Sequence, residues 1–505
     1  MRVQGNRGQS CQLTEQLCAR QLVLSAVVLY APPMDFLDRQ DELDLLETRW
    51  ARDSAELLVI WGRRRVGKTE LLSRFVNERR GLLFEATSGT TADQLGDLTR
   101  VLAETTGDAL LREQPLTSWP AALVAIERFA TERCAVVLDE FQYLAQADPG
   151  LPSLLARWWR EKGRHLPLML FLSGSEISFF EHAVLGQGSA LFGRRTGQLQ
   201  VVPFGYREAA LFVPGWSTED RVRAYAVWGG MPYYLSQTDD AASVAENILR
   251  TTLSRDSVLR EEARLLLFQE LAEPRLHFSV LRALAGGDTR VSQLANRIGS
   301  DASTVSRVLD ALASLLLVRR VVPVTATLRG RTRQTSWEIL DSYLRFWFRF
   351  VLPYEDRLLR PEGQRRHLEQ TILPALDAFV SRPAFERIAQ DYLRAQNVGA
   401  AVGSWWGKVP TGEGRLTETR EVDAVALRDD GSVAALGSCK WTAEPMGLAE
   451  ESLLARLEPF VKPAAEGPPP VHYFFSRSGF DEGLRGLAAT QPEQSVLVGL
   501  DELYA

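Results

Sequence analysis

Residues 56–72 read ELLVIWGRRRVGKTELL. The first six residues are largely apolar, which is typical of a short strand that is buried on both faces. Residues 62–69 then follow the pattern G-x-x-x-x-G-K-[ST], and residues 70–75 have the composition of a helix. This order of strand, glycine-rich loop and helix is the context in which a phosphate-binding P-loop occurs, so an α/β fold is expected.

The loop residues predict how a nucleotide would be held. Glycines let backbone N–H groups close around phosphate oxygens, and the start of the helix adds partial positive charge. Lys68 can reach the β- and γ-phosphates, and Thr69 can bind Mg²⁺. The predicted nucleotide-binding residues of the loop are Gly62, Arg63, Arg64, Arg65, Val66, Gly67, Lys68, Thr69 and Glu70.

A second apolar run, residues 134–140, ends in two carboxylates about seventy residues after the loop. Asp139 is predicted to hold Mg²⁺ together with Thr69, and Glu140 to polarise the attacking water. ATP is favoured over GTP because no guanine-reading N-K-x-D pattern follows. We therefore predict an ATPase with ATP and Mg²⁺ as cofactors and with Glu140 and Lys68 as catalytic residues.

Two further features extend this site. A third apolar run, residues 166–172, ends at Ser173, whose hydroxyl would sense the γ-phosphate unless it belongs to a simple turn at the end of a strand. Arg194 and Arg195 follow a glycine and would stabilise charge on the transferred phosphoryl group, from the same or a neighbouring subunit. In a chain this rich in arginine, a solvated pair is the alternative interpretation.

These motifs, together with PF at 203–204 and GGMPYYL at 229–235, resemble the archaeal-type AAA-related ATPases of the broader STAND-like group. The resemblance covers most of residues 34–350. It implies an ASCE P-loop core, a helical lid around the Gly-Gly-x-Pro segment, and a winged helix.

The predicted winged helix-turn-helix spans residues 273–330, where three helical patterns are separated by glycine-containing turns. Thr304, Ser306 and Arg307 face outward near the start of the third helix, where a recognition helix touches bases. Residues 319–322 and the basic residues 329–333 resemble a wing. DNA and a protein partner both remain open, since winged helices also serve as docking modules. The aromatic residues from 337 to 350 indicate a helix buried against a neighbour, and stacking platforms for nucleic acid are the alternative.

A third group of residues lies in the C-terminal part. Glu386 lies on a predicted helix, while Asp423 and Lys440 lie on two predicted strands that can bring them to one point. Two carboxylates for a divalent metal and a lysine to orient water suit phosphodiester hydrolysis. The order resembles the PD-(D/E)XK, restriction-endonuclease-like superfamily. Ser438 stands where Glu or Gln is expected, which should lower metal affinity and puts cleavage in doubt, and a structural ion pair is the alternative.

The chain has 505 residues, which predicts three or four domains. We expect an α/β architecture whose parts follow in this order: 1–33 a leader, 34–205 the ATPase core, 206–272 the helical lid, 273–330 the winged helix, 331–382 a helical connector, and 383–505 a restriction-endonuclease-like α/β domain. The leader is interpreted as disordered or as a start codon assigned too early, with a secretory signal as the alternative.

Composition excludes several classes of protein. The apolar fraction of 45% and charged fraction of 24% are ordinary for a soluble protein, and no apolar run reaches the ~18 residues of a membrane helix. Four scattered cysteines form no disulfide framework and five histidines form no metal-like cluster, so a cytoplasmic location is expected. The net charge of −6 leaves a nucleic-acid partner open.

The sequence favours an ATPase whose nucleotide state moves the lid and winged helix relative to the C-terminal domain, on or near DNA. One alternative is a metal-dependent DNA nuclease regulated by ATP. The other is a regulatory ATPase scaffold that binds protein partners and carries an inactive nuclease-like domain. A homo-oligomer is compatible with each of these, and no membrane is involved.

Overall fold

The computed structural model describes residues 36–271, 274–327, 335–410, 417–461 and 467–505. The predicted leader and the basic loop at 329–333 lie outside these residues. The chain divides between Val202 and Pro203 into two compact units. Among the described residues, none of the helices combines the length and the apolar character needed to cross a membrane.

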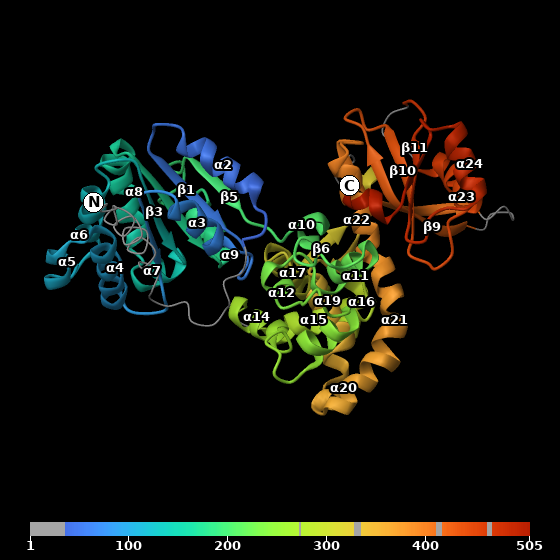
Figure 1. Ribbon diagram of the computed structural model, residues 1–505, viewed down its shortest axis with the longest axis horizontal. Coiled ribbons are helices and arrows are strands. Elements are labelled where there is room, and N and C mark those ends of the chain that lie inside the picture. The colour runs from blue at the N-terminus through green and yellow to red at the C-terminus, as the bar shows by residue number, and fades with distance from the viewer. Residues whose placement is uncertain (1–35, 272–273, 328–334, 411–416, 462–466) are drawn as a thin grey trace, which may run out of the picture. The chain divides into compact units, whose positions relative to one another are not determined.

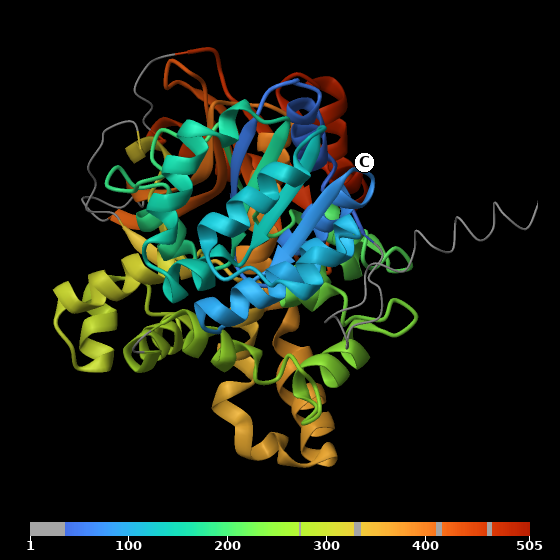
Figure 2. The same ribbon diagram turned by 90° about the vertical axis from the view of Figure 1, so that its left-hand side faces the viewer.

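The first unit contains a five-stranded parallel sheet with the order β2-β3-β4-β1-β5. Its strands are β1 Glu56–Trp61, β2 Gly81–Glu85, β3 Cys134–Asp139, β4 Leu168–Gly174 and β5 Gly197–Gln200. Every residue of β1, β3 and β4 is buried, because helices of this unit pack around the sheet (Figures 1 and 2). This burial explains why the three strands have apolar rather than alternating sequences.

The helices of this unit begin where the sequence supplies caps. A capping box of Thr90 and Asp93 starts α4, and the Ser118 side chain caps α6. The helices are α2 Gln40–Trp50, α3 Lys68–Asn77, α4 Thr91–Thr106, α5 Ala109–Glu113, α6 Trp119–Phe129, α7 Phe141–Ala147, α8 Leu151–Glu161, η1 Gly163–His165, α9 Ile177–Phe179 and η2 Phe180–Val184.

The strand order positions the site. β4 lies between β1 and β3, and all three strands are parallel. Their carboxyl ends therefore meet at one edge of the sheet, the edge at which open α/β sheets bind ligands. The P-loop after β1, the two carboxylates at the end of β3 and the two serines at the end of β4 all lie at this edge.

The second unit begins with a helical segment in which two sequence motifs meet. Phe204 N donates a hydrogen bond of 2.8 Å to Gly230 O. A Cβ atom at Gly230 would lie 1.8 Å from Phe204 O, so only glycine fits here. The helices of this segment are α10 Tyr206–Ala210, α11 Thr218–Trp228, α12 Pro232–Leu235, α13 Val244–Ile248, η3 Leu249–Leu253 and α14 Glu262–Glu270.

Four helices and a two-stranded antiparallel sheet follow. They are α15 Pro274–Ala285, α16 Val291–Ile298, α17 Ala302–Ser314, β6 Val318–Val321, α18 Val324–Thr327 and β7 Ser336–Ile339. Asp301 caps α17 by accepting from Thr304 N at 2.9 Å. The next helix, α19 Ser342–Phe350, buries Tyr343, Phe346, Trp347, Phe348 and Phe350. The prediction of a buried helix is confirmed for the aromatic residues from Tyr343 to Phe350, whereas Trp337 lies in β7.

A series of helices leads to the C-terminal sheet: η4 Leu352–Leu359, α20 Pro361–His367, η5 Leu368–Ile372, α21 Leu373–Phe379, η6 Val380–Phe385 and α22 Glu386–Ala395. The sheet has the order β12-β11-β10-β9-β8, antiparallel from β8 to β10 and parallel from β10 to β12. Its elements are β8 Ala401–Pro410, β9 Thr417–Leu427, β10 Val433–Lys440, α23 Leu448–Leu457, η7 Glu458–Phe460, β11 Val471–Ser476, α24 Glu482–Thr490, β12 Ser495–Val498 and α25 Leu500–Tyr504.

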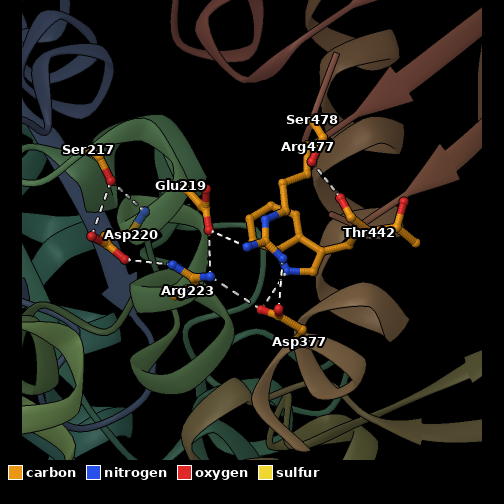
Figure 3. Close-up of polar contacts among 9 residues, drawn as sticks. Ser217, Glu219, Asp220, Arg223, Asp377, Thr442, Arg477 and Ser478 are labelled. Carbon is orange, nitrogen blue, oxygen red and sulfur yellow. Dashed lines mark hydrogen bonds and ion pairs between the residues drawn. The ribbon is translucent and has the colours of Figure 1, made fainter. Parts of the chain in front are cut away.

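Charged side chains join three parts of the second unit (Figure 3). Asp377 of α21 accepts from Arg223 of α11 at 3.3 Å and from Arg477, just after β11, at 2.7 Å. Glu219 of α11 binds the same two arginines, at 2.5 and 2.7 Å. Trp441 Nε1 donates to Asp377 at 3.1 Å. These ion pairs connect α11 and α21 with the end of β11, and the Trp441 hydrogen bond connects α21 with the end of β10.

Candidate functional site

The loop after β1 depends on unusual backbone angles. Gly67 has a φ of 90°, which glycine adopts without strain, and it directly precedes α3. Arg65, two residues earlier, also has a positive φ, of 67°. The two left-handed residues turn the chain sharply, so that the N-terminal turn of α3 starts at Lys68.

The Lys68 side chain lies against this loop and is only 5% exposed. Its ammonium group donates to Gly62 O at 2.9 Å and to Arg63 O at 3.2 Å. The charge is thus kept beside the loop backbone and the start of a helix. A phosphate placed there would meet a lysine, backbone amides and the positive end of the helix dipole.

The second residue of α3 meets the end of β3. Thr69 Oγ1 donates to Asp139 Oδ2 at 2.6 Å, and Asp139 is fully buried. Asp139 Oδ1 accepts from Glu140 N at 3.0 Å. The structure therefore brings together the two residues that the sequence assigns to one metal.

Glu140 is held in a defined position. Its φ of 50° is uncommon for a residue with a side chain, and such conformations cluster at functional sites. Its Oε2 accepts from Ser175 Oγ at 2.8 Å, from Ser175 N at 3.2 Å and from Gln142 Nε2. Sequence reasoning missed Ser175 and Gln142, although Ser175 lies only two residues after Ser173.

Ser173, the serine that the sequence assigns to phosphate sensing, behaves differently. It is fully buried in β4 beside Ile60 of β1, and no hydrogen-bond partner for its Oγ exists within the described part of the chain. A buried hydroxyl without a partner is costly, so this position suits a bound polar group.

Negative charge is concentrated at this edge of the sheet. Desolvation and the nearby charge of Asp139 raise the pKa of Glu70. Desolvation, followed by the charges of Asp139, Glu140 and Glu70, raises the pKa of Glu85, which pairs with Asp139 across β2 and β3. Four carboxylates thus repel one another beside the loop. Glu85 carries no motif signal in the sequence.

The other predicted arginines lie in different settings. Arg64 donates to the Tyr143 hydroxyl, a contact between the loop and α7. Arg194 donates to Ala190 O at 2.7 Å, and Arg195 to Leu185 O at 3.3 Å. Both of these bonds stay within the segment that follows η2, and no hydrogen bond or ion pair of the described residues joins Arg194 or Arg195 to the P-loop.

The C-terminal candidates come from α22, β9 and β10. Asp423 Oδ2 accepts from Cys439 N at 2.8 Å, which fixes it beside the strand that carries Ser438 and Lys440. Burial and the charge of Asp423 raise the pKa of Glu386 to about 8, although Arg382, 3.7 Å away, opposes the shift. Burial raises the pKa of Asp423 to about 6, and the charge of Lys440 offsets part of this rise. The structure thus brings the four residues of this cluster into one neighbourhood.

Glu450 of α23 is a member of this cluster that the sequence analysis missed. Its carboxylate accepts from Ser438 Oγ at 2.8 Å and lies 3.1 Å from Lys440 Nζ. Glu421 is paired instead with Arg382, at 2.5 and 2.7 Å. Within the described ranges, no group of three or more His, Cys, Asp and Glu side chains is arranged to hold a metal ion.

Three known families match parts of the chain. Residues 36–238 match an ATPase domain found predominantly in Archaea. Residues 219–337 match a domain of unknown function, and residues 347–452 match archaeal and bacterial proteins of unknown function. The first match contains the P-loop, both carboxylates after β3 and the serines after β4.

Individual relatives and solved structures were also found. An uncharacterized protein of Methanocaldococcus jannaschii is 27% identical over 417 residues, which cover 80% of this chain and 87% of that protein. An uncharacterized ATP-binding protein of the same organism is 42% identical over 45 residues, 9% of this chain and 76% of that one. The Walker-type ATPase of Pyrococcus abyssi has a TM-score of 0.46 at 21% identity, covering 64% of this chain and 99% of that one. The ORC2 protein of Aeropyrum pernix, in ADPNP–ADP complexes, has a TM-score of 0.41 at 15% identity, covering 68% and 96%.

The family match and the geometry at the edge of the sheet agree. A nucleotide-binding loop, the Thr69–Asp139 hydrogen bond and a positioned Glu140 lie within the matched residues. Residues 36–238 therefore resemble an ATPase domain found predominantly in Archaea, and the protein is an ATPase.

Proposed function

We propose that ATP binding and hydrolysis at the P-loop move the helical lid and the winged helix relative to a nuclease-like C-terminal domain, and that the protein acts on or near DNA. The observation that carries this proposal is the contact of Thr69 with Asp139, beside Lys68. Nucleotide can shift a conformational equilibrium only through contacts that differ between the two states, and these residues are placed to make such contacts.

Mg²⁺ is the proposed partner of the nucleotide. Thr69 and Asp139 would hold it, since a hydroxyl and a carboxylate oxygen are ligands that Mg²⁺ accepts. The crowding of Asp139 with Glu70, Glu85 and Glu140 supports the fit, because a divalent cation would offset the repulsion among these carboxylates. When bound, Mg²⁺ would neutralise charge on the β- and γ-phosphate oxygens.

The protein's own residues have proposed roles in hydrolysis. Lys68 binds the β- and γ-phosphates once it leaves the carbonyls of Gly62 and Arg63. Glu140 orients the attacking water and accepts its proton. The Ser173 hydroxyl donates to the γ-phosphate, which would give it the partner that it otherwise lacks within the described part of the chain. Arg194 and Arg195 are proposed to stabilise phosphoryl charge, from this subunit or another.

DNA is the proposed partner of the α15–α17 segment. The core side of α17 is buried through Val305, Val308 and Leu309, while Arg307 near its start is exposed. Thr304 and Ser306 lie on the same first turns and are half-buried. A capped helix with a polar, basic N-terminal end is how winged helices present side chains to base edges.

A metal-dependent nuclease regulated by ATP is the second candidate function. Its specific support is Glu450, whose carboxylate reaches Ser438 and Lys440 from α23. This carboxylate stands beside the position at which β10 has a serine. Metal bound by Glu386 and Asp423 would then have a third acidic residue nearby. The contrasting proposal is a scaffold in which the same contacts are structural and the winged helix binds protein.

One experiment separates these proposals. The purified protein is mixed with ATP, Mg²⁺ or Mn²⁺ and labelled DNA, and ATP turnover, DNA retention and nicking are measured together. We expect turnover and salt-dependent retention, with both retention and its ATP response changed in Lys68→Ala. Nicking that disappears in Asp423→Ala, in Lys440→Ala and in Glu450→Gln supports the nuclease. Equal retention on DNA and on an inert polyanion supports the scaffold instead.

A further inference from the structure

Arg39, directly before α2, is a buried arginine with an uncommon backbone. Its φ is 77°, in the left-handed region, and it is 5% exposed. A charged side chain is rarely buried unless polar groups bind it. Its guanidinium donates to Glu42 Oε1 at 2.8 Å, to Val66 O at 2.9 Å and to Val202 O at 2.9 Å.

Two of these acceptors belong to segments far apart in the sequence. Val66 lies in the P-loop, between the two left-handed residues Arg65 and Gly67. Val202 is the last residue of the first compact unit. The guanidinium of Arg39 therefore links the P-loop to residues 201–202, the exit segment at the end of the ATPase core. The rigid fork of a guanidinium suits such a double contact better than an ammonium group.

The same exit segment also meets the beginning of the P-loop. Val201 N donates to Trp61 O at 2.8 Å. A Cβ atom on Gly62 would lie 2.2 Å from Val201 O, so the two backbones are packed too closely for any other residue. Residues 201–202 thus contact the end of β1 at Trp61, the loop at Gly62, and Val66 through Arg39.

The exit segment itself is stiff. Val202 precedes Pro203, and a residue before proline is restricted to extended conformations. A shift of the loop backbone would therefore meet little conformational freedom at Val202. Phosphate in such a loop is held by backbone N–H groups, so its binding would act on the peptide that joins Val66 O to Gly67 N.

We propose that Arg39 is a positioning residue that transmits the nucleotide state of the P-loop to residues 201–202. Arg39 does not touch the phosphates in this role; it acts through the Val66 and Val202 carbonyls. The proposal rests on nucleotide binding at the P-loop. It adds the route by which that binding reaches the end of the ATPase core.

Hydrogen–deuterium exchange of the full chain, with and without ADP, tests this route. In the wild type, ADP is expected to slow exchange in a peptide covering the P-loop and in a second peptide covering residues 197–206. In Arg39→Gln, the P-loop peptide should keep its protection, while the ADP-dependent protection of residues 197–206 should fall at least fivefold. Arg39→Lys keeps the charge but loses the fork, so it should resemble Arg39→Gln.

Arg49→Gln is the matched control. Arg49 lies on α2, the helix that Arg39 precedes, and it contacts Glu56 and the carbonyl of Thr196, next to the first residue of β5. This variant should keep the ADP response of residues 197–206. The proposal is overturned if Arg39→Gln keeps that response, or if Arg49→Gln loses it equally. If ADP protects only the P-loop peptide of the wild type, the route through Arg39 is refuted but nucleotide binding is not. If the wild type does not bind ADP, both proposals are refuted.

Discussion

The Thr69 hydroxyl donates a hydrogen bond of 2.6 Å to the buried carboxylate of Asp139. The two residues are 70 positions apart in the sequence. Thr69 follows β1 and Asp139 ends β3. These two parallel strands are separated only by β4, and their carboxyl ends lie at the same edge of the sheet. The contact fixes the start of α3 against the end of β3, so the loop, the acidic residues and the positioned Glu140 form a single site.

Replacing Lys68 by alanine should remove nucleotide binding. The ammonium is the only side-chain charge that the pattern of the loop places on the β- and γ-phosphates, and a lost contact of this kind costs roughly 10²–10³ in turnover. Phosphate release and binding of a fluorescent ADP analogue measure the two effects. Lys162→Ala is the matched control, since Lys162 is exposed and lies after α8. Unchanged ATP hydrolysis in Lys68→Ala would show that the loop does not hold the nucleotide.

The Glu140→Gln variant should bind ATP as well as the wild type but hydrolyse it about 10²–10⁴-fold more slowly, because an amide cannot accept the proton of the water. Binding measured by fluorescence and turnover measured by phosphate release should therefore separate. Glu181→Gln, at an exposed position in η2, controls for the loss of one negative charge. A turnover close to that of the wild type would remove Glu140 from the mechanism.

Ser175→Ala tests how Glu140 is positioned. The change removes the 2.8 Å hydrogen bond from the Ser175 hydroxyl but leaves the backbone N–H contact. We expect kcat to fall about tenfold, which corresponds to ~1.4 kcal/mol of transition-state stabilisation, while the affinity for ADP stays the same. Ser178→Ala, three residues along and exposed, should have no such effect. A fall in ADP affinity with unchanged kcat would mean that Ser175 acts on binding instead.

The sequence could predict those parts of the site that depend on local pattern. Residues 56–61 and 134–139 form the strands expected from their apolar runs, and the aromatic residues of α19 are buried as their density indicates. The G-x-x-x-x-G-K-[ST] pattern located Lys68 and Thr69 because loop chemistry is encoded by consecutive residues.

Contacts made by tertiary packing carry no such pattern. Ser175 was passed over for Ser173 because two serines flanking one glycine look alike, and only the position of Glu140 separates them. Glu450 contacts Lys440 from α23, the helix that follows β10. The alternating pattern of the strands gives no indication of this contact. Arg39 precedes an amphipathic helix, and the residues next to it in the sequence do not predict its contacts with Val66 and Val202.

The paired acids of the C-terminal domain should make its stability depend on pH. The pKa values of Glu386 and Asp423 are raised to about 8 and about 6, above their ordinary values near 4, mainly by burial. Between about pH 4 and pH 8 the folded state holds more protons on these two residues than the unfolded state does. Their contribution to the free energy of unfolding is therefore fully present near pH 4 and is lost as the pH rises toward 8. Glu386→Gln keeps the shape of the side chain without its charge. Its melting temperature should exceed that of the wild type by about 2–4 °C at pH 8, and the difference should vanish near pH 5. Glu418→Gln, in an exposed ion pair of β9, should show little pH dependence. An equal gain at both pH values would indicate a packing effect and not the titration of Glu386.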